Sequence, residues 1–496
     1  MSESTTEPIA ATTSGRVKGI TRDGVHMFRS IPYAAPPVGV RRFRPPIPAE
    51  PWDDVRDATK FGPVAPQNAS MLETMLGAPE PEIDESKCLT LTVFTPALDD
   101  AKRPVMFWIH GGAFVIGSGS SPIYDGRRFA AHGDVVVVSI NYRLGALGFL
   151  HLDDIFGPEF SGSGNAGILD QVCALEWVRD NIAAFGGDPS QITIFGESAG
   201  GMSVGTLLGL PAAQGLFARA IVQSGGGSFC LTPERGTDIA RTLLAEAGIT
   251  TPEELQSAPL DAILEAQGKT FSGNLSVEIP FMPVVDGTVL PDRPVDAVAA
   301  GLGSVPTLIG TNHDEMTLFM AFDLGMGEID GAAVHRELVA RFGGRADAVL
   351  GEYQAEYPDA SPIDLMTAIA TDRVFRMPSI RLAEAGVDHR PTFMYLFTWA
   401  TPAFGGKLKS GHALELPFMW DAIDRPGLSM LTGDGPERQA LADAMHGAWI
   451  RFARTGDPGW PAYDLERRAT QRFDTTLEII DDPMSAEREL WAAVVV

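Results

Sequence analysis

Cysteine is scarce in this chain, with three residues among 496 (Cys88, Cys173 and Cys230). So few cysteines at such wide spacing exclude a disulfide framework and a zinc site built on cysteine. Long apolar runs are also missing: the run at 135–140 has the length of a buried strand, not of a membrane span. The first eight residues are polar and acidic and lack the pattern of a secretory signal. We therefore expect a cytoplasmic protein without a membrane anchor.

Positively charged residues are few. The chain has 38 Lys and Arg residues and 64 Asp and Glu residues, which gives a net charge of −26 at pH 7. Nucleic acids and anionic membrane surfaces would repel such a chain, so neither is expected as a partner. We interpret the acidity as an aid to solubility rather than as a preference for a charged substrate. The hydrophobic content of 45% is that of an ordinary soluble globular protein.

Internal repeats and low-complexity linkers are absent as well, so residues 1–496 are predicted to form a single domain with a disordered tail at 1–14. Continuous apolar runs at 105–109 and 135–140 are typical of strands that are covered on both faces. Residues 165–185 carry apolar side chains at helical spacing and end at two glycines. The alternation of such segments predicts an α/β fold with a mostly parallel sheet flanked by helices.

Two regions, 233–270 and 328–390, are rich in Ala, Glu, Leu and Arg and are predicted to be helical insertions. In a sheet enzyme such insertions build the lid and the pocket walls above the strand ends. Further strands are expected at 191–195, 306–309 and 393–399, and a further helix at 440–455.

The strongest functional signal is the sequence Gly-Glu-Ser-Ala-Gly at 196–200, which follows the apolar strand at 191–195. A serine is a weak nucleophile unless a sharp strand-to-helix turn exposes its oxygen beside a base, and this pattern makes that turn. The pattern recurs at 201–205, but there no strand precedes it, and Ser203 falls inside the following helix. We therefore predict that Ser198 is the nucleophile and that Ser203 is a packing residue.

The segment His-Gly-Gly-Ala-Phe at 110–114 follows the strand at 105–109. A glycine-rich turn there can point successive backbone N–H groups into one hollow, where they would stabilise an oxyanion. By itself the segment fits a plain strand-to-helix turn equally well. Together with Ser198 it predicts an oxyanion hole made by the N–H groups of Gly112, Ala113 and Ala199.

A serine nucleophile needs a histidine base and an acid that orients it, and in α/β hydrolases both follow the serine along the chain. His389 and His412 lie in predicted loops, and the position of His412 after the strand at 393–399 favours it. The acid is expected after the strand at 306–309, where Asp314 and Glu315 are equally well spaced. Activity should then fall as His412 becomes protonated, near its reference pKa of about 6.5.

These motifs resemble the type-B carboxylesterase/lipase family, which includes the cholinesterases, and in character they are closest to the bacterial para-nitrobenzyl-type esterases. The resemblance runs from about residue 15 to 473. The segments that carry it are 28–37, 42–43, 108–114, 141–143, 164–165, 169–171, 195–201, 310–315 and 412–418.

The resemblance implies an α/β-hydrolase fold and a Ser-His-Glu triad in which Glu315, not Asp314, is the acid and His412 is the base. It also places Glu197 and Ser224 in a supporting polar network, although Ser224 fits a simple turn nearly as well. No metal and no organic cofactor are implied.

The activity that the resemblance implies is serine carboxylic-ester hydrolysis through an acyl-enzyme, acting on small to medium neutral esters. An amidase or carbamate hydrolase with the same triad is an alternative. A non-catalytic cholinesterase-like binding protein is another, but such members typically lose a catalytic residue, and here the whole set is present. The expected partner is a small-molecule ester, and the expected assembly is a monomer or a weak homo-oligomer.

The chain also departs from the family pattern. Ala65 stands where many members have a cysteine that pairs with the equivalent of Cys88, so Cys88 should be a free thiol. Residues 66–87 lack an aromatic side chain that could stack on a choline cation, so choline esters are poor candidates. Met316 replaces a common glycine and is predicted to shape the pocket wall. Phe319 and Phe322 are candidates for lining an acyl pocket, although core packing is the favoured explanation for each.

Overall fold

The computed structural model describes residues 7–69, 81–270, 279–323, 329–425 and 427–493. Its main feature is an eleven-stranded sheet with the order β14-β13-β12-β11-β10-β9-β7-β8-β6-β4-β3. The strands from β8 to β13 are parallel to one another, and the remaining neighbours pair antiparallel. The strand bounds are β3 (Ile20–Arg22), β4 (Val25–Pro32), β6 (Thr90–Thr95), β7 (Arg103–Ile109), β8 (Val136–Ile140), β9 (Gly187–Glu197), β10 (Arg219–Gln223), β11 (Thr307–Asn312), β12 (Thr392–Phe397), β13 (Ala469–Phe473) and β14 (Glu478–Asp481).

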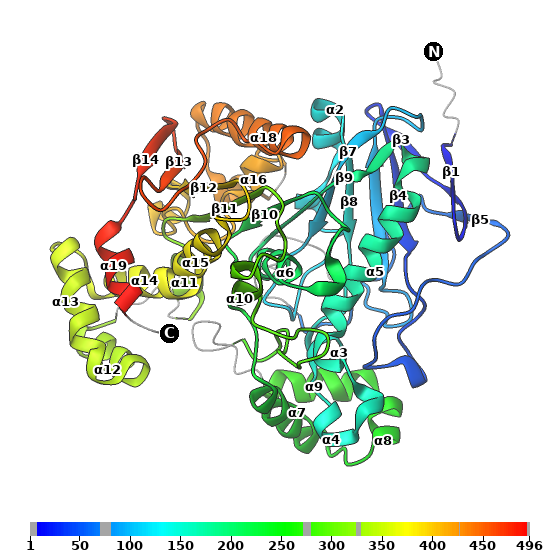
Figure 1. Ribbon diagram of the computed structural model, residues 1–496, viewed down its shortest axis with the longest axis horizontal. Helices are drawn as coiled ribbons and strands as arrows, with labels where there is room; N and C mark the ends of the chain where they lie inside the picture. The colour runs from blue at the N-terminus through cyan, green and yellow to red at the C-terminus, as the bar shows by residue number, and fades with distance from the viewer. Residues whose placement is uncertain (1–6, 70–80, 271–278, 324–328, 426, 494–496) are drawn as a thin grey trace.

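Helices cover both faces of this sheet, as Figure 1 shows. The α-helices before the first insertion are α2 (Arg127–Gly133), α3 (Gly145–Phe149), α4 (Asp153–Phe156), α5 (Ala166–Asn181) and α6 (Ala199–Leu208). Those after it are α10 (Pro294–Ala299), α11 (Met316–Asp323), α16 (Leu416–Met419), α17 (Ser429–Thr432), α18 (Glu437–Thr455) and α19 (Ser485–Ala493).

Alternate residues of the central strands pack into two separate hydrophobic cores, one on each face of the sheet. In β7, Val105 and Phe107 belong to the core that also contains the apolar side chains of α5 and α6. Met106 and Trp108 face the opposite way and join the core beneath α2 and α18. This alternation explains the continuous apolar run, because both faces of a central strand are covered. The predicted α/β-hydrolase fold with its large, mostly parallel sheet is confirmed.

The expected disordered tail at 1–14 is too long. Residues Ile9–Thr12 form β1, which pairs antiparallel with β2 (Gly15–Lys18) in a small sheet completed by β5 (Val55–Asp57). Ala10 is buried there, and Val17 is buried opposite it, so apolar packing holds this strand in place. Residues 1–6 of the expected tail lie outside the described part of the chain.

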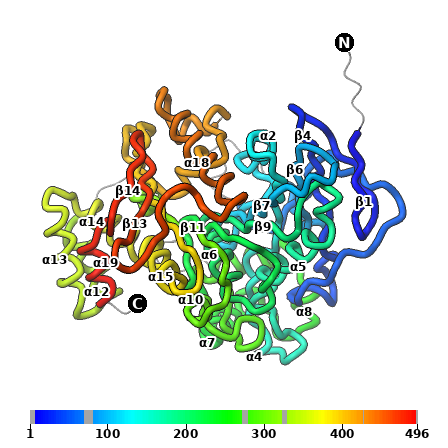
Figure 2. The backbone as a smooth tube through the Cα atoms, turned by 45° about the horizontal axis from the view of Figure 1, so that its top comes forward, coloured from blue at the N-terminus to red at the C-terminus, as the bar shows by residue number. Residues whose placement is uncertain are grey.

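Both predicted insertions are helical. The first contains α7 (Pro233–Ala247), α8 (Pro252–Ser257) and α9 (Leu260–Thr270), and Figure 1 places this group beside α4. The second contains α12 (Gly331–Phe342), α13 (Ala346–Glu356), α14 (Pro362–Thr371) and α15 (Met377–Gly386). The C-terminal helix α19 returns to pack against α13, which Figure 2 shows from a second angle.

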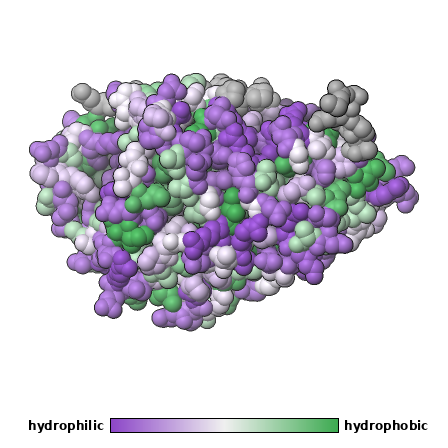
Figure 3. Space-filling model, turned by 90° about the horizontal axis from the view of Figure 1, so that it is seen from above, coloured by the Kyte–Doolittle hydropathy of each residue, from purple (hydrophilic) through white to green (hydrophobic). Residues whose placement is uncertain are grey.

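The surface is mainly hydrophilic. In Figure 3 hydrophilic side chains dominate the visible face and hydrophobic ones form scattered patches, as the charge composition predicts. None of the helices in the described part of the chain has both the length and the apolar character needed to cross a bilayer.

Candidate active site

Ser198 lies on the sharp turn between the end of β9 and the start of α6. Its backbone has φ 56° and ψ −126°, a conformation that non-glycine residues rarely adopt. The neighbouring glycines allow this turn, because a Cβ at Gly200 would overlap the carbonyl oxygen of Ile109 and a Cβ at Gly196 would overlap Gly200. Strain of this kind is typical of a residue that is held in place for function.

The predicted oxyanion loop packs directly against the serine. A Cβ built on Gly111 would lie 3.1 Å from the Cβ of Ser198. Gly112, Ala113 and Phe114 all have positive φ, so the loop turns back on itself at this point. Among the hydrogen bonds of the described residues, none uses the backbone N–H of Gly112 or Ala113 as donor. The N–H of Ala199 begins α6 and has no partner within that helix. All three predicted donors are therefore free of other hydrogen bonds in the described part of the chain.

The structure brings His412 and Glu315 together. His412 Nδ1 and Glu315 Oε2 are 2.6 Å apart and share a hydrogen bond, and the backbone N–H of His412 donates to the carbonyl of Glu315 at 3.1 Å. Ser224 Oγ donates to Glu315 Oε1 at 2.6 Å. Asp314 faces another way and accepts a hydrogen bond from Ser410 Oγ at 2.8 Å. The two candidate acids are therefore separated by geometry, and only Glu315 reaches the imidazole.

The other ring nitrogen of His412 faces Glu197. Nε2 lies 3.1 Å from Glu197 Oε1. No hydrogen bond joins Ser198 Oγ to His412 among the described residues. Catalytic hydrogen bonds are often long or misaligned before substrate binds, so the pairing of Ser198 with His412 stays a prediction.

Glu415 is a third buried carboxylate beside His412, and sequence reasoning did not single it out. Its Oε2 accepts a hydrogen bond from Asn312 Nδ2 at 2.8 Å, and its Oε1 accepts one from Gln223 Nε2 at 3.1 Å. Glu415 has no exposed surface. The signal that could have found it is its place in the 412–418 segment, three residues after His412.

Burial and charge shift the pKa values of this cluster strongly. Burial alone would lower the pKa of His412, but the carboxylates of Glu197 and Glu315 outweigh it and raise that pKa to about 9. Burial raises the pKa of Glu197, with Glu415 and Glu315 adding to the effect and His412 opposing it. Burial also raises the pKa of Glu415, together with the charge of Glu315. The reference pKa of 6.5 expected for His412 therefore does not describe this site.

Two phenylalanine rings cover the imidazole. The ring centroids of Phe319 and Phe375 lie 5.0 Å and 4.6 Å from that of His412. Phe319 was predicted to line the pocket, whereas Phe375 was missed because it lies far along the chain in the second insertion. Met316 is 1% exposed and packs in the hydrophobic core, and its role in shaping the pocket stays a prediction. Phe322 lies in α11, but its side chain is outside the described part.

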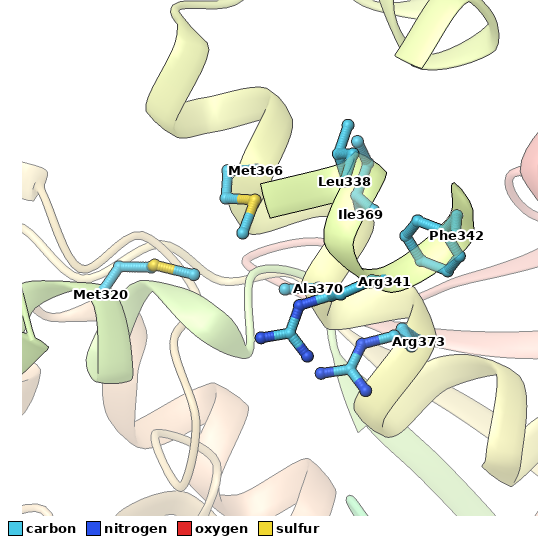
Figure 4. Close-up of a pocket in the computed structure, with 8 residues that line it drawn as sticks. All are labelled: Met320, Leu338, Arg341, Phe342, Met366, Ile369, Ala370 and Arg373. Carbon is cyan, nitrogen blue, oxygen red and sulfur yellow. The ribbon is translucent and has the colours of Figure 1, made fainter. Parts of the chain in front are cut away.

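A small hollow lies between α11, α12 and α14 and is also lined by Arg373. Figure 4 shows that the guanidinium groups of Arg341 and Arg373 point to the same side of it, toward Met320. Burial, with the charge of Arg341, lowers the pKa of Arg373 to about 10. None of the predicted catalytic residues lines this hollow, so it does not contain the proposed reacting groups.

The chain is similar to known carboxylesterases over nearly its whole length. The sequence model of the carboxylesterase family matches residues 6–491. The chain is 40% identical to the para-nitrobenzyl esterase of Bacillus subtilis over 502 residues, which cover 98% of each chain. It is 38% identical to the phenmedipham hydrolase of Pseudarthrobacter oxydans, covering 92% of this chain and 93% of that one. The structure of the Geobacillus stearothermophilus carboxylesterase EST55 superposes with a TM-score of 0.89 at 44% identity, covering 97% of this chain and 99% of that chain.

Proposed function

The chain belongs to the carboxylesterase family, and we propose that it hydrolyses its ester substrates through Ser198, His412 and Glu315. Its membership and its relatives make it a serine carboxylic-ester hydrolase that acts on small-molecule esters. The assignment of residues to roles is supported above all by the 2.6 Å contact between His412 and Glu315. It is supported further by the packing of the glycine loop against Ser198.

In the proposed reaction Ser198 Oγ attacks the ester carbonyl while His412 Nε2 accepts its proton. The N–H groups of Gly112, Ala113 and Ala199 would hold the negative oxygen of the tetrahedral intermediate. His412 then returns the proton to the departing alcohol, which leaves the acyl group on Ser198. Water, activated by the same imidazole, releases the acid. The protein groups in these steps are thus Ser198, His412 and three backbone N–H groups.

Glu315 and Glu197 would have different tasks in this reaction. Glu315, hydrogen-bonded to Nδ1, fixes the tautomer that leaves Nε2 free to accept a proton. Glu197 lies on the Nε2 side and would stabilise the imidazolium that forms during attack. Ser224 would hold Glu315 in place.

The experiment that tests the proposal compares Ser198→Ala with Ser203→Ala on p-nitrophenyl acetate and butyrate. Loss of the nucleophile should lower kcat by about 10⁴-fold or more. Ser203 belongs to the second Gly-x-Ser-x-Gly pattern and accepts a hydrogen bond from Gln171 in the core, so its variant should keep nearly full activity. Near-normal activity in Ser198→Ala would overturn the assignment.

Carbamate or amide hydrolysis is the second candidate. It is suggested by the phenmedipham hydrolase relative, which is a carbamate hydrolase. The same triad would serve both reactions. Relative kcat/KM values for a phenyl ester and for the matched phenyl carbamate and anilide separate them. Esters should be turned over fastest, because nitrogen donation makes the carbamate and anilide carbonyls less electrophilic. The anilide must in addition expel an aniline nitrogen, which is a poorer leaving group than phenoxide. A carbamate that outpaces its matched ester would reverse this order.

The finer features of the activity are inferred in the same way. Small to medium neutral esters fit a site in which the rings of Phe319 and Phe375 cover His412, the proposed catalytic base. The two helical insertions would form the lid and walls, since the second one supplies Phe375. A cytoplasmic monomer or weak homo-oligomer remains the inferred state, and light scattering across a concentration series measures the assembly.

A further inference from the structure

A second cluster of titratable side chains lies where the segment after α3 meets the first insertion. His151 follows α3, and Asp153 and Asp154 begin α4. Nε2 of the histidine and one carboxylate oxygen of each aspartate all lie within 4.8 Å of one another. Figure 1 shows α4 beside α7 and α8, and the cluster shares no residue with the proposed active site.

The histidine is buried and aimed at the two carboxylates. His151 is 3% exposed, and its Nε2 has no hydrogen-bond partner of acceptable geometry among the described residues. That nitrogen lies 3.1 Å from Asp153 Oδ1 and 3.4 Å from Asp154 Oδ2. A buried polar atom left without a hydrogen bond is costly, so this arrangement calls for a further bonding partner.

The spacing of these atoms matches that of ligands around a small cation. Metal–nitrogen and metal–oxygen bonds of about 2.0–2.2 Å in a tetrahedral or octahedral shell place neighbouring ligand atoms about 3.0–3.5 Å apart. Both measured distances from Nε2 fall in that interval. A charge-assisted hydrogen bond to one carboxylate would instead be about 2.7–2.9 Å long.

The surrounding residues hold the cluster in this geometry. A Cβ on Gly164 would lie 3.2 Å from Nδ1 of His151, and one on Gly236 would lie 3.1 Å from its Cβ, so the ring is confined on two sides. Thr237 Oγ1, on α7, donates to Asp154 Oδ2 at 2.8 Å. Outer contacts of this kind orient metal ligands and contribute to affinity.

The exposed sides of the two aspartates leave a path for a hydrated ion. Their side chains are 25% and 55% exposed, whereas that of His151 is 4% exposed. Water could therefore complete the coordination shell on the open side. The net charge of −26 also raises the concentration of cations around the protein.

We propose that His151, Asp153 and Asp154 bind one divalent cation of the Zn²⁺ type. One imidazole nitrogen with two carboxylate oxygens suits zinc better than calcium, which prefers six to eight oxygen ligands. Because Thr237 joins Asp154 to α7, the bound ion stabilises the contact between α4 and the insertion at 233–270. The ion takes no part in ester hydrolysis, so this site is independent of the proposed triad.

The test is calorimetric titration of the untagged, EDTA-dialysed protein with ZnCl₂, combined with thermal melting. The wild type should bind one ion tightly and melt at a higher temperature in its presence. The double variant Asp153→Asn/Asp154→Asn should bind at least about tenfold more weakly and lose the rise in Tm. Asp238→Asn, on α7 and paired with Arg241 outside the cluster, is the matched control and should behave as the wild type.

Three results would overturn the site. The first is an absence of heat and of any Tm shift at millimolar ZnCl₂. The second is equal zinc affinity in the double variant, which would place the ion elsewhere, such as at His412, where it would also inhibit the esterase. The third is tighter binding of CaCl₂ than of ZnCl₂.

Discussion

At the scale of single residues, the surroundings of the buried His412 decide how it would behave as the proposed base. Its Nδ1 contacts Glu315 and its Nε2 faces Glu197, so each side of the ring meets a carboxylate. Both charges stabilise the imidazolium and raise the pKa of His412 to about 9 despite burial. A protonated imidazole accepts no proton from Ser198, so this environment should control the pH dependence of the enzyme.

The first prediction concerns that dependence. The kcat/KM of the wild type for p-nitrophenyl acetate should rise with pH through a midpoint above 6.5, because His412 must lose its proton to act as base. Glu197→Gln removes a negative charge 3.1 Å from Nε2, which destabilises the imidazolium and should lower the midpoint. Because the two groups titrate together, the midpoint belongs to the pair. Rate profiles from pH 5 to 10 measure it, and a midpoint that stays or rises in the variant would contradict this account.

The second prediction separates two interpretations of Ser224. If it is only a turn residue, Ser224→Ala should leave the activity unchanged. If it positions Glu315, the lost hydrogen bond to a charged group should lower kcat/KM by about tenfold or more. Ser203→Ala provides the matched control, because Ser203 is another buried hydroxyl near the site. The pH midpoint of kcat/KM should also shift in Ser224→Ala. A Glu315 carboxylate that is held less firmly interacts differently with the imidazolium of His412.

The choice between Asp314 and Glu315 illustrates what could not be predicted from residue spacing. The two are adjacent, so either fits the expected position after β11. Only the fold shows that Asp314 turns to Ser410 and Glu315 to His412. Glu415 was missed for a related reason: its partners Gln223 and Asn312 lie 192 and 103 residues away along the chain.

At the scale of elements, local patterns predicted the strand before Ser198 and the helix before that strand well. The apolar strand at 191–195 lies within β9, and the helix expected at 165–185 comprises α5 and a following turn that ends at Gly186. Strong periodicity and glycine signals explain this success. The strand β1 was missed because its short, weakly apolar sequence becomes a strand only by pairing with β2.

The third prediction concerns the contact between β7 and α6 that supports the sharp turn at Ser198. A Cβ at Gly200 would overlap the carbonyl of Ile109, so Gly200→Ala should push α6 away from β7. We expect a loss of about 2–3 kcal/mol in the free energy of unfolding and a steep loss of activity. Urea unfolding measures the first effect.

The matched control is Gly447→Ala, in the middle of α18, where nothing lies within 4 Å of a new Cβ. There alanine should stabilise the helix by about 0.5–1 kcal/mol or leave it unchanged. If both variants were equally stable and active, close packing against β7 would not be the reason for a glycine at position 200.

At the scale of the whole molecule, the fold class could be predicted but the strand order could not. Alternating strands and helices indicate an α/β sheet, yet β7 lies between β8 and β9, an arrangement set by crossover connections and not by local sequence. In that order β7 is the direct neighbour of β9, and only β10 separates β9 from β11. The ends of these three strands therefore lie close together. The oxyanion loop, Ser198 and Glu315 follow those strands, which is why residues distant in sequence meet at one edge of the sheet.

The central claim is that the chain carries one activated serine, Ser198. The most direct measurement is peptide mass spectrometry after reaction with diethyl p-nitrophenyl phosphate, which phosphorylates an activated serine and releases p-nitrophenol. We predict one diethylphosphoryl group per chain, located on Ser198, formed in step with the loss of esterase activity and absent from Ser198→Ala. A label on Ser203 or on any other residue, or full activity in a chain completely labelled at Ser198, would contradict the claim.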